Sequence, residues 1–154
     1  MFDRVLVVCV GNICRSPMAE ALLRARLGRR PRFDVSSAGV SAMVGHPADD
    51  LAVALMRERG IDISGHRARQ VTPQLVSESD LVLVMEAGHE RAVLQIAPQA
   101  RGKVHRIGKF GDFDVPDPYR LPRAAFLEAL QLVERGVSDY ERAFWPSPVR
   151  KVHG

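Results

Sequence analysis

A continuous apolar run near the N-terminus constrains the fold of this chain most. Residues Arg4–Cys9 (RVLVVC) are apolar from the second position onward and rich in valine. Strands that are apolar on both faces are typical of parallel sheets, in which helices cover both sides. We therefore expect this run to be a buried strand of an α/β protein, with ligands binding beyond the carboxyl ends of the strands.

The rest of the chain alternates strand-like and helix-like segments, with Ser16 expected as the N-cap and Pro17 in the first turn of the first helix. Gly108–Arg120 is rich in glycine, proline and aspartate and predicts a long functional loop. The segment after Trp145 is expected to fray. This order predicts one domain over residues 1–154, a three-layer α/β/α fold with a four-stranded parallel sheet. The further predicted strands are Phe33–Ala38, Asp80–Met85 and Lys103–Ile107, and the predicted helices are Ser16–Gly28, Pro47–Gly60, Pro73–Ser77, Glu90–Ala97, Arg123–Glu134 and Ser138–Phe144.

Composition places the chain among globular proteins of a reducing compartment. Hydrophobic residues make up 46% and charged residues 26% of the chain, which argues against disorder. No run approaches the roughly 20 apolar residues of a membrane span, and the N-terminus lacks a signal pattern. The two cysteines, Cys9 and Cys14, cannot form a secreted disulfide framework, so we expect a cytoplasmic protein without membrane insertion. The net charge of +4 indicates attraction to an anion of unspecified kind.

The loop after the first strand, Cys9–Ser16 (CVGNICRS), is suited to bind an oxyanion. A short loop before a helix directs backbone N–H groups toward an anion, and the helix adds the positive end of its dipole. Gly11 allows close approach of the backbone, and the guanidinium of Arg15 matches two phosphate oxygens. The same positive field favours the thiolate of Cys9, and Ser16 can donate its hydroxyl to it. An anion bound here would lie against a reactive sulfur.

Two structural readings compete with this interpretation. Cys9 could be a small apolar residue that fills space at the end of a strand, as buried cysteines often do. A zinc site is disfavoured, because Cys9 and Cys14 are too far apart for a zinc knuckle and no second ligand pair follows. The combination of strand, loop, Arg15 and the Ser-Pro helix start favours the reactive cysteine, and we expect no metal.

At these residues the sequence resembles the low-molecular-weight protein tyrosine phosphatases. The resemblance covers essentially the whole chain, at residues 8–17 (VCVGNICRSP), 36–39 (SSAG), 65–70 (GHRARQ) and 117–119 (DPY). It is closest to bacterial members that accompany tyrosine autokinases in exopolysaccharide or capsule synthesis. It implies that the substrates are tyrosine-phosphorylated proteins, including such an autokinase, and that no cofactor is needed.

The resemblance also assigns roles to single residues. It implies that Cys9 is the nucleophile, Arg15 the phosphate clamp and Asp117 the general acid, which would protonate the departing phenol and later activate water. Asn12, Ser37 and His66 would hydrogen-bond together and hold the loop open, and Tyr119 would line the rim of the pocket. The residues that would contact the phosphate or the substrate are Val10, Gly11, Asn12, Ile13, Cys14, Ser16 and Tyr119.

Several alternatives stay open beside these roles. Asp117-Pro118 could be an ordinary turn, and His66 a surface histidine beside Gly65. Cys14 could form a protective disulfide with Cys9 under oxidation, or could pack as a small thiol. The rim carries Arg120 and Met43 where many eukaryotic members carry aromatic residues, which puts their peptide preferences in doubt here.

Rival functions are weighed against the same residues. An arsenate reductase would need further cysteines, and none follows Cys14. Protein arginine phosphatases typically carry threonine where Ile13 stands, and an apolar wall suits an aryl group better. A non-catalytic phosphate-binding regulatory module would need neither a nucleophile nor an acid. Nucleic acid binding is disfavoured, because basic residues are scattered and aromatic residues make up only 6% of the chain.

Overall fold

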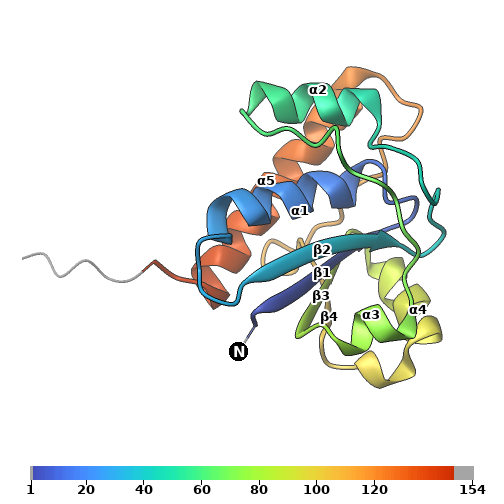
Figure 1. Ribbon diagram of the computed structural model, residues 1–154, viewed down its shortest axis with the longest axis vertical. Helices are drawn as coiled ribbons and strands as arrows, with labels where there is room; N and C mark the ends of the chain where they lie inside the picture. Colours follow the sequence, from blue (N-terminus) through green and yellow to red (C-terminus); the bar gives the residue numbers. More distant parts are fainter. Residues whose placement is uncertain (1, 148–154) are drawn as a thin grey trace, which may run out of the picture.

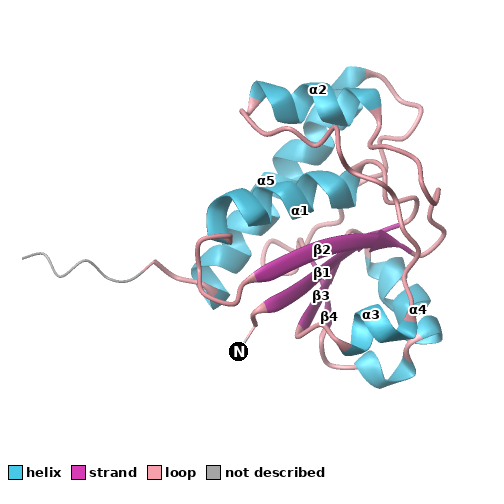
Figure 2. Ribbon diagram, viewed as in Figure 1, coloured by secondary structure: helices cyan, strands magenta, loops and turns pink. Residues whose placement is uncertain are grey.

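The computed structural model describes residues 2–147 and contains one parallel sheet covered by helices on both faces (Figures 1 and 2). The predicted fold class is therefore confirmed. The strands lie in the order β2-β1-β3-β4, so the first strand is paired on both sides. The strands are β1 (Arg4–Cys9), β2 (Asp34–Gly39), β3 (Leu81–Val84) and β4 (Val104–Arg106); the helices are α1 (Arg15–Leu27), α2 (Asp50–Glu58), α3 (Pro73–Ser77), α4 (Ala87–Ile96), the short 3-10 helix η1 (Pro98–Ala100) and α5 (Arg123–Phe144).

Alternate residues of β1 enter two separate apolar clusters, because successive side chains of a strand point to opposite faces. Val5, Val7 and Cys9 belong to the larger cluster, which joins the sheet to α1, α2 and α5. Leu6 and Val8 belong to the smaller cluster, between the sheet and α3 and α4. Figure 1 shows these two groups of helices on opposite sides of the sheet. Burial on both faces explains why β1 lacks the alternation of a half-exposed strand.

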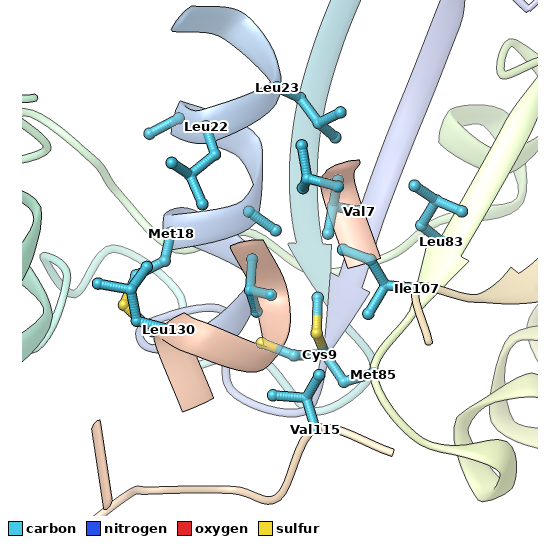
Figure 3. Packing of buried hydrophobic residues seen from close by; sticks show 14 of the residues in the cluster. Val7, Cys9, Met18, Leu22, Leu23, Leu83, Met85, Ile107, Val115 and Leu130 are labelled. Atoms are coloured by element: carbon cyan, nitrogen blue, oxygen red, sulfur yellow. The ribbon is translucent and has the colours of Figure 1, made fainter. Parts of the chain in front are cut away.

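The apolar cluster extends to the carboxyl end of the sheet. In Figure 3 the side chain of Cys9 lies in the cluster beside Met85, from the end of β3, and Val115. Cys9, Met85 and Val115 are at most 2% exposed. The sulfur atom of Cys9 therefore lies at the end of this apolar cluster, at the carboxyl edge of the sheet.

Two predicted helices at the C-terminus form a single helix, so this expectation was wrong. The sequence around Gly136 suggested a break, because glycine is a poor helix former. In the structure α5 runs without interruption from Arg123 to Phe144. A Cβ atom at position 136 would lie 2.6 Å from the carbonyl oxygen of Ile107. Gly136 therefore allows a close approach between α5 and the chain leaving β4, rather than ending a helix.

The N-cap of α1 was predicted two residues too late. The N-cap position belongs to Cys14, without a side-chain capping bond, and the helix begins at Arg15. Ser16 lies inside the helix, where its hydroxyl contacts Cys9. Helix α2 begins at Asp50 rather than Pro47, because the carboxylate of Asp49 accepts the N–H of Leu51.

The remaining differences are small. Helix α4 begins three positions before the predicted Glu90, at Ala87. Residues 107–122, between β4 and α5, contain no strand or α-helix, as the composition predicted. Residues 148–154, which hold most of the segment expected to fray, lie outside the described residues. Within residues 2–147, none of the helices has both the length and the apolar character needed to cross a membrane.

Candidate active site

The loop between β1 and α1 has its carbonyl groups turned outward. Each carbonyl from Cys9 to Ile13 accepts a hydrogen bond from a group outside the loop. A trans peptide bond places each carbonyl opposite the N–H of the next residue, so the N–H groups of this loop face inward. Asn12 has φ of 60°, in the left-handed region that asparagine tolerates. The partners of the carbonyls, in chain order, are Val40 N, Ser41 N, Met43 N, His66 Nε2 and Asp49 N, at 2.7–3.0 Å.

Asn12 uses every polar group of its side chain to fix this loop. Its amide nitrogen donates to the hydroxyl groups of Ser16 at 2.8 Å and Ser37 at 2.9 Å. Its amide oxygen accepts the backbone N–H of Arg69 at 2.9 Å. Since a backbone N–H can only donate, this last bond fixes the orientation of the amide. The expected hydrogen bond to Ser37 is present, whereas His66 binds the backbone oxygen of Asn12 rather than its side chain.

The hydrogen bond between Cys9 and Ser16 has a direction that follows from its neighbours. Cys9 Sγ lies 2.8 Å from Ser16 Oγ, and both residues are buried. Ser16 Oγ already accepts from Asn12, which has only donors on that nitrogen. The single hydroxyl hydrogen of Ser16 is therefore free to point at the sulfur. A hydrogen bond donated to a sulfur atom stabilises negative charge on it.

Arg15 is the largest of the fully buried side chains, with 1% exposure. Its Nη1 donates to Glu86 Oε2 at 2.6 Å and to the carbonyl oxygen of Val115 at 2.7 Å. Its Nε is buried and has no hydrogen-bond partner among the described residues. A buried charged donor without a partner is costly, so this arrangement fits a site that binds an anion.

Asp117 faces the same pocket from the loop before α5. Its Oδ2 lies 3.7 Å from Arg15 Nη2, and its Oδ1 accepts the backbone N–H of Tyr119 at 3.0 Å. This second bond is the turn that the Asp-Pro pair suggested, so the turn and a catalytic role are compatible. The carboxyl group is 46% exposed, which leaves it accessible to a substrate.

The pocket has a volume of about 140 Å³ and combines polar and apolar walls. Asn12, Ser16, Ser37 and His66 are not among its lining residues, and their hydrogen bonds support the loop. Met43 contributes an apolar side chain to the lining, and the Arg120 guanidinium lies 5.2 Å from the centre of the Tyr119 ring. The lining residues are Cys9, Val10, Gly11, Ile13, Cys14, Arg15, Ser41, Met43, Asp117 and Tyr119.

Cys14 is a free, buried thiol inside the loop. Burial, followed by the charge of Asp49, raises the pKa of the Cys14 thiol far above its ordinary value. Cys14 is therefore protonated at neutral pH, unlike a cysteine placed to act as a nucleophile.

Sequence reasoning missed the acidic residues that hold this site. Glu86 anchors Arg15, and Glu20 accepts the hydroxyl of Ser37 at 2.5 Å. A signal existed for Glu86, because it directly follows the apolar run Asp80–Met85 and so lies at the carboxyl edge of the sheet, as Cys9 does. Glu20 gave no such signal, since a glutamate within a helical segment is usually exposed to solvent.

Comparisons with known proteins agree with this geometry. The sequence profile of the family "Low molecular weight phosphotyrosine protein phosphatase" matches residues 4–144. The chain is 50% identical over 140 residues to a protein of Ralstonia nicotianae named "Probable low molecular weight protein-tyrosine-phosphatase EpsP", covering 91% of this chain and 94% of that protein. It is 43% identical to the structure of Vibrio vulnificus Wzb in complex with benzylphosphonate, with a TM-score of 0.88 and coverage of 94% of this chain and 100% of that chain.

A more distant likeness concerns a related activity. A structure of the YwlE arginine phosphatase, in which an active-site serine is phosphorylated, is 28% identical, with a TM-score of 0.84 and coverage of 91% of this chain and 94% of that chain. The identity is well below that to Wzb, and both structures share the fold. The family profile, the identities and the site geometry agree, and this chain belongs to the low molecular weight phosphotyrosine protein phosphatase family of enzymes.

Proposed function

We propose that this phosphatase hydrolyses phosphotyrosine through a cysteinyl-phosphate intermediate formed on Cys9. One observation carries the proposal: Cys9, whose sulfur accepts the Ser16 hydroxyl, lines one pocket together with Asp117 and with Arg15, whose buried Nε has no partner among the described residues. A nucleophile, an anion clamp and an acid in one pocket are what ester cleavage requires, whereas phosphate binding alone requires only the clamp.

In the first step the Cys9 thiolate attacks phosphorus. A sulfur–phosphorus bond forms, the bond from phosphorus to the phenol oxygen breaks, and protonated Asp117 gives its proton to that oxygen. The inward N–H groups of the loop and Arg15 bind the phosphoryl oxygens, on which negative charge must be stabilised. Tyrosine leaves, and Asp117 remains as a carboxylate.

In the second step Asp117 takes a proton from water, and the water oxygen attacks phosphorus. The sulfur–phosphorus bond breaks, inorganic phosphate leaves, and the Cys9 thiolate returns to the hydrogen bond with Ser16. Because Ser16 stabilises negative charge on the sulfur, it makes Cys9 a better leaving group in this step. Val10, Gly11, Ile13 and Cys14 supply walls and N–H groups of the pocket.

The proposed substrates are tyrosine-phosphorylated proteins, and a bacterial tyrosine autokinase is the proposed partner. The apolar side chains of Ile13 and Met43 and the ring of Tyr119 line the pocket and suit the flat phenyl group of phosphotyrosine. The likeness to the bacterial relatives supports the kinase partner, and the two free cysteines suit a reducing cytoplasm. We propose neither a cofactor nor a metal for the reaction, because Arg15 and the backbone groups supply the positive charge.

The test compares hydrolysis by the wild-type enzyme, Cys9→Ser and Asp117→Asn in the presence of a chelator. Cys9→Ser should lose all measurable turnover. In kcat/KM, which reports the steps up to departure of the phenol, Asp117→Asn should lose about a hundredfold or more on phosphotyrosine, since general acids contribute about 10²–10⁴-fold, and less on esters with acidic phenols. Undiminished turnover by Cys9→Ser would contradict the mechanism.

The same assay separates the rival functions. Parallel phosphotyrosine and phosphoarginine peptides should show preference for phosphotyrosine, because Ile13 offers no partner to a guanidinium group. Preference for phosphoarginine would identify an arginine phosphatase. Binding of phosphopeptides without turnover would identify a non-catalytic phosphate-binding module.

A further inference from the structure

The loop that carries Asp117 is tied to two other elements through Asp114. Asp114 Oδ1 accepts Arg106 Nη1, from β4, at 3.1 Å and the backbone N–H of Ala87, at the start of α4, also at 3.1 Å. The other end of the same guanidinium binds Asp112 Oδ1 at 2.7 Å. Arg106 thus spans two carboxylates of one loop, and Asp114 joins that loop to β4 and α4.

This tie lies directly beside the part of the loop that touches the active site. The residue after Asp114 is Val115, whose N–H donates to Met85 at 2.9 Å and whose carbonyl accepts from Arg15 at 2.7 Å. Asp117 follows between Pro116 and Pro118. Because proline fixes φ at positions 116 and 118, this segment has fewer variable backbone angles with which to absorb a displacement at Asp114.

Arg106 is itself held firmly. Its carbonyl oxygen accepts the hydroxyl of Tyr140, on α5, at 2.8 Å, and Tyr140 is completely buried. The side chain of Arg106 is 23% exposed, whereas those of Asp112 and Asp114 are 89% and 45% exposed. Exposed ion pairs contribute little to stability, so this arrangement is poorly explained as a device that stabilises the fold.

We propose that Arg106 and Asp114 are positioning residues that set the location of the Asp117 carboxyl over the leaving-group oxygen. The inference rests on the proposed role of Asp117 as the general acid. Proton transfer depends on hydrogen-bond distance, and a misplacement of about 1 Å can cost about a hundredfold in rate. Arg106 and Asp114 therefore affect protonation of the phenol, and not binding of the phosphoryl group by the Cys9 loop.

The experiment uses the full-length enzyme and two substrates that differ in their need for an acid. Arg106→Gln and Asp114→Asn are compared with wild type in kcat/KM for a phosphotyrosine peptide and for p-nitrophenyl phosphate, whose phenol leaves readily without a proton. Both variants should lose about tenfold on the peptide and much less on p-nitrophenyl phosphate, because part of the acid's contribution is lost. Inhibition by inorganic phosphate should be unchanged.

Two further variants make the result unambiguous. Arg26→Gln removes another partly exposed guanidinium with two partners, Ser138 and Glu141, between α1 and α5, and should leave the ratio of the two substrates unchanged. Asp117→Asn sets the full loss expected when the acid is absent. Asp114→Asn keeps an oxygen that can accept the N–H of Ala87, so it is the variant least disturbing to folding.

Equal losses on both substrates, or no loss on either, would overturn the inference, since a merely structural role does not distinguish between leaving groups. If Asp117→Asn loses more on the peptide than on p-nitrophenyl phosphate, but Arg106→Gln and Asp114→Asn do not, the inference is overturned while the proposed role of Asp117 stands. If Asp117→Asn itself shows no dependence on the leaving group, the proposed role of Asp117 fails, and the inference fails with it.

Discussion

Asn12 is the single residue on which the shape of the Cys9 loop depends most. Its left-handed backbone turns the loop, and its side chain joins Ser16, Ser37 and the backbone of Arg69. The motif in the sequence identified Asn12, Cys9 and Arg15 because they are neighbours in the chain. Glu86 was missed because its contact with Arg15 joins residues far apart in the sequence, and no local pattern encodes such a contact.

His89 is a single residue that makes the stability of the protein depend on pH. Burial, followed by the positive charge of Arg15, lowers the pKa of His89 below its ordinary value of 6.5. Its ring lies 3.4 Å from Glu86, which holds Arg15, and its Nδ1 is buried without a partner among the described residues. The folded protein therefore favours the neutral ring.

The sign of the effect follows from linkage. As pH falls through about 6.5, the unfolded chain binds a proton at position 89 before the folded protein does, so the free energy of unfolding falls. His89→Gln cannot bind that proton. Urea denaturation at neutral and mildly acidic pH should therefore show a smaller loss of stability in the variant than in wild type. Equal losses in the two proteins would contradict the assignment.

At the scale of elements, the sequence predicted every strand within about one residue, because the apolar runs are short and sharply bounded. Helix ends were less accurate. The start of α1 depends on a loop shaped by tertiary contacts, and the continuity of α5 depends on a close approach to Ile107 that glycine permits. Local propensity cannot report either feature, since both are set by residues distant in sequence.

Gly136 provides the element-scale test. Gly136→Ala should destabilise the protein by about 1–3 kcal/mol, because the added Cβ would lie 2.6 Å from the Ile107 carbonyl oxygen and α5 would have to shift. Urea denaturation measures the change. Gly88→Ala in α4 is the matched control: a Cβ atom there meets nothing within 4 Å, so stability should be unchanged or slightly increased. A stabilised Gly136→Ala variant would contradict the close approach.

At the scale of the whole molecule, the parallel sheet explains how one edge collects the site. β1 and β3 are parallel neighbours, so Cys9 and Glu86 both lie at the carboxyl edge of the sheet, where Glu86 binds Arg15. This arrangement was predictable from the alternation of strands and helices. The path of the loop over residues 107–122 was not, because it depends on side-chain bonds to Arg106, Ala87 and Arg15.

The central claim, a covalent phosphoryl group on Cys9, is open to direct measurement. The enzyme is mixed with a phosphotyrosine peptide, quenched rapidly in acid and digested, and the peptide that contains Cys9 and Cys14 is analysed by mass spectrometry. The account predicts one added phosphoryl group, located on Cys9, in wild type and in Cys14→Ser, and none in Cys9→Ala. A catalytically active enzyme that never carries this group, or that carries it on another residue, would contradict the account.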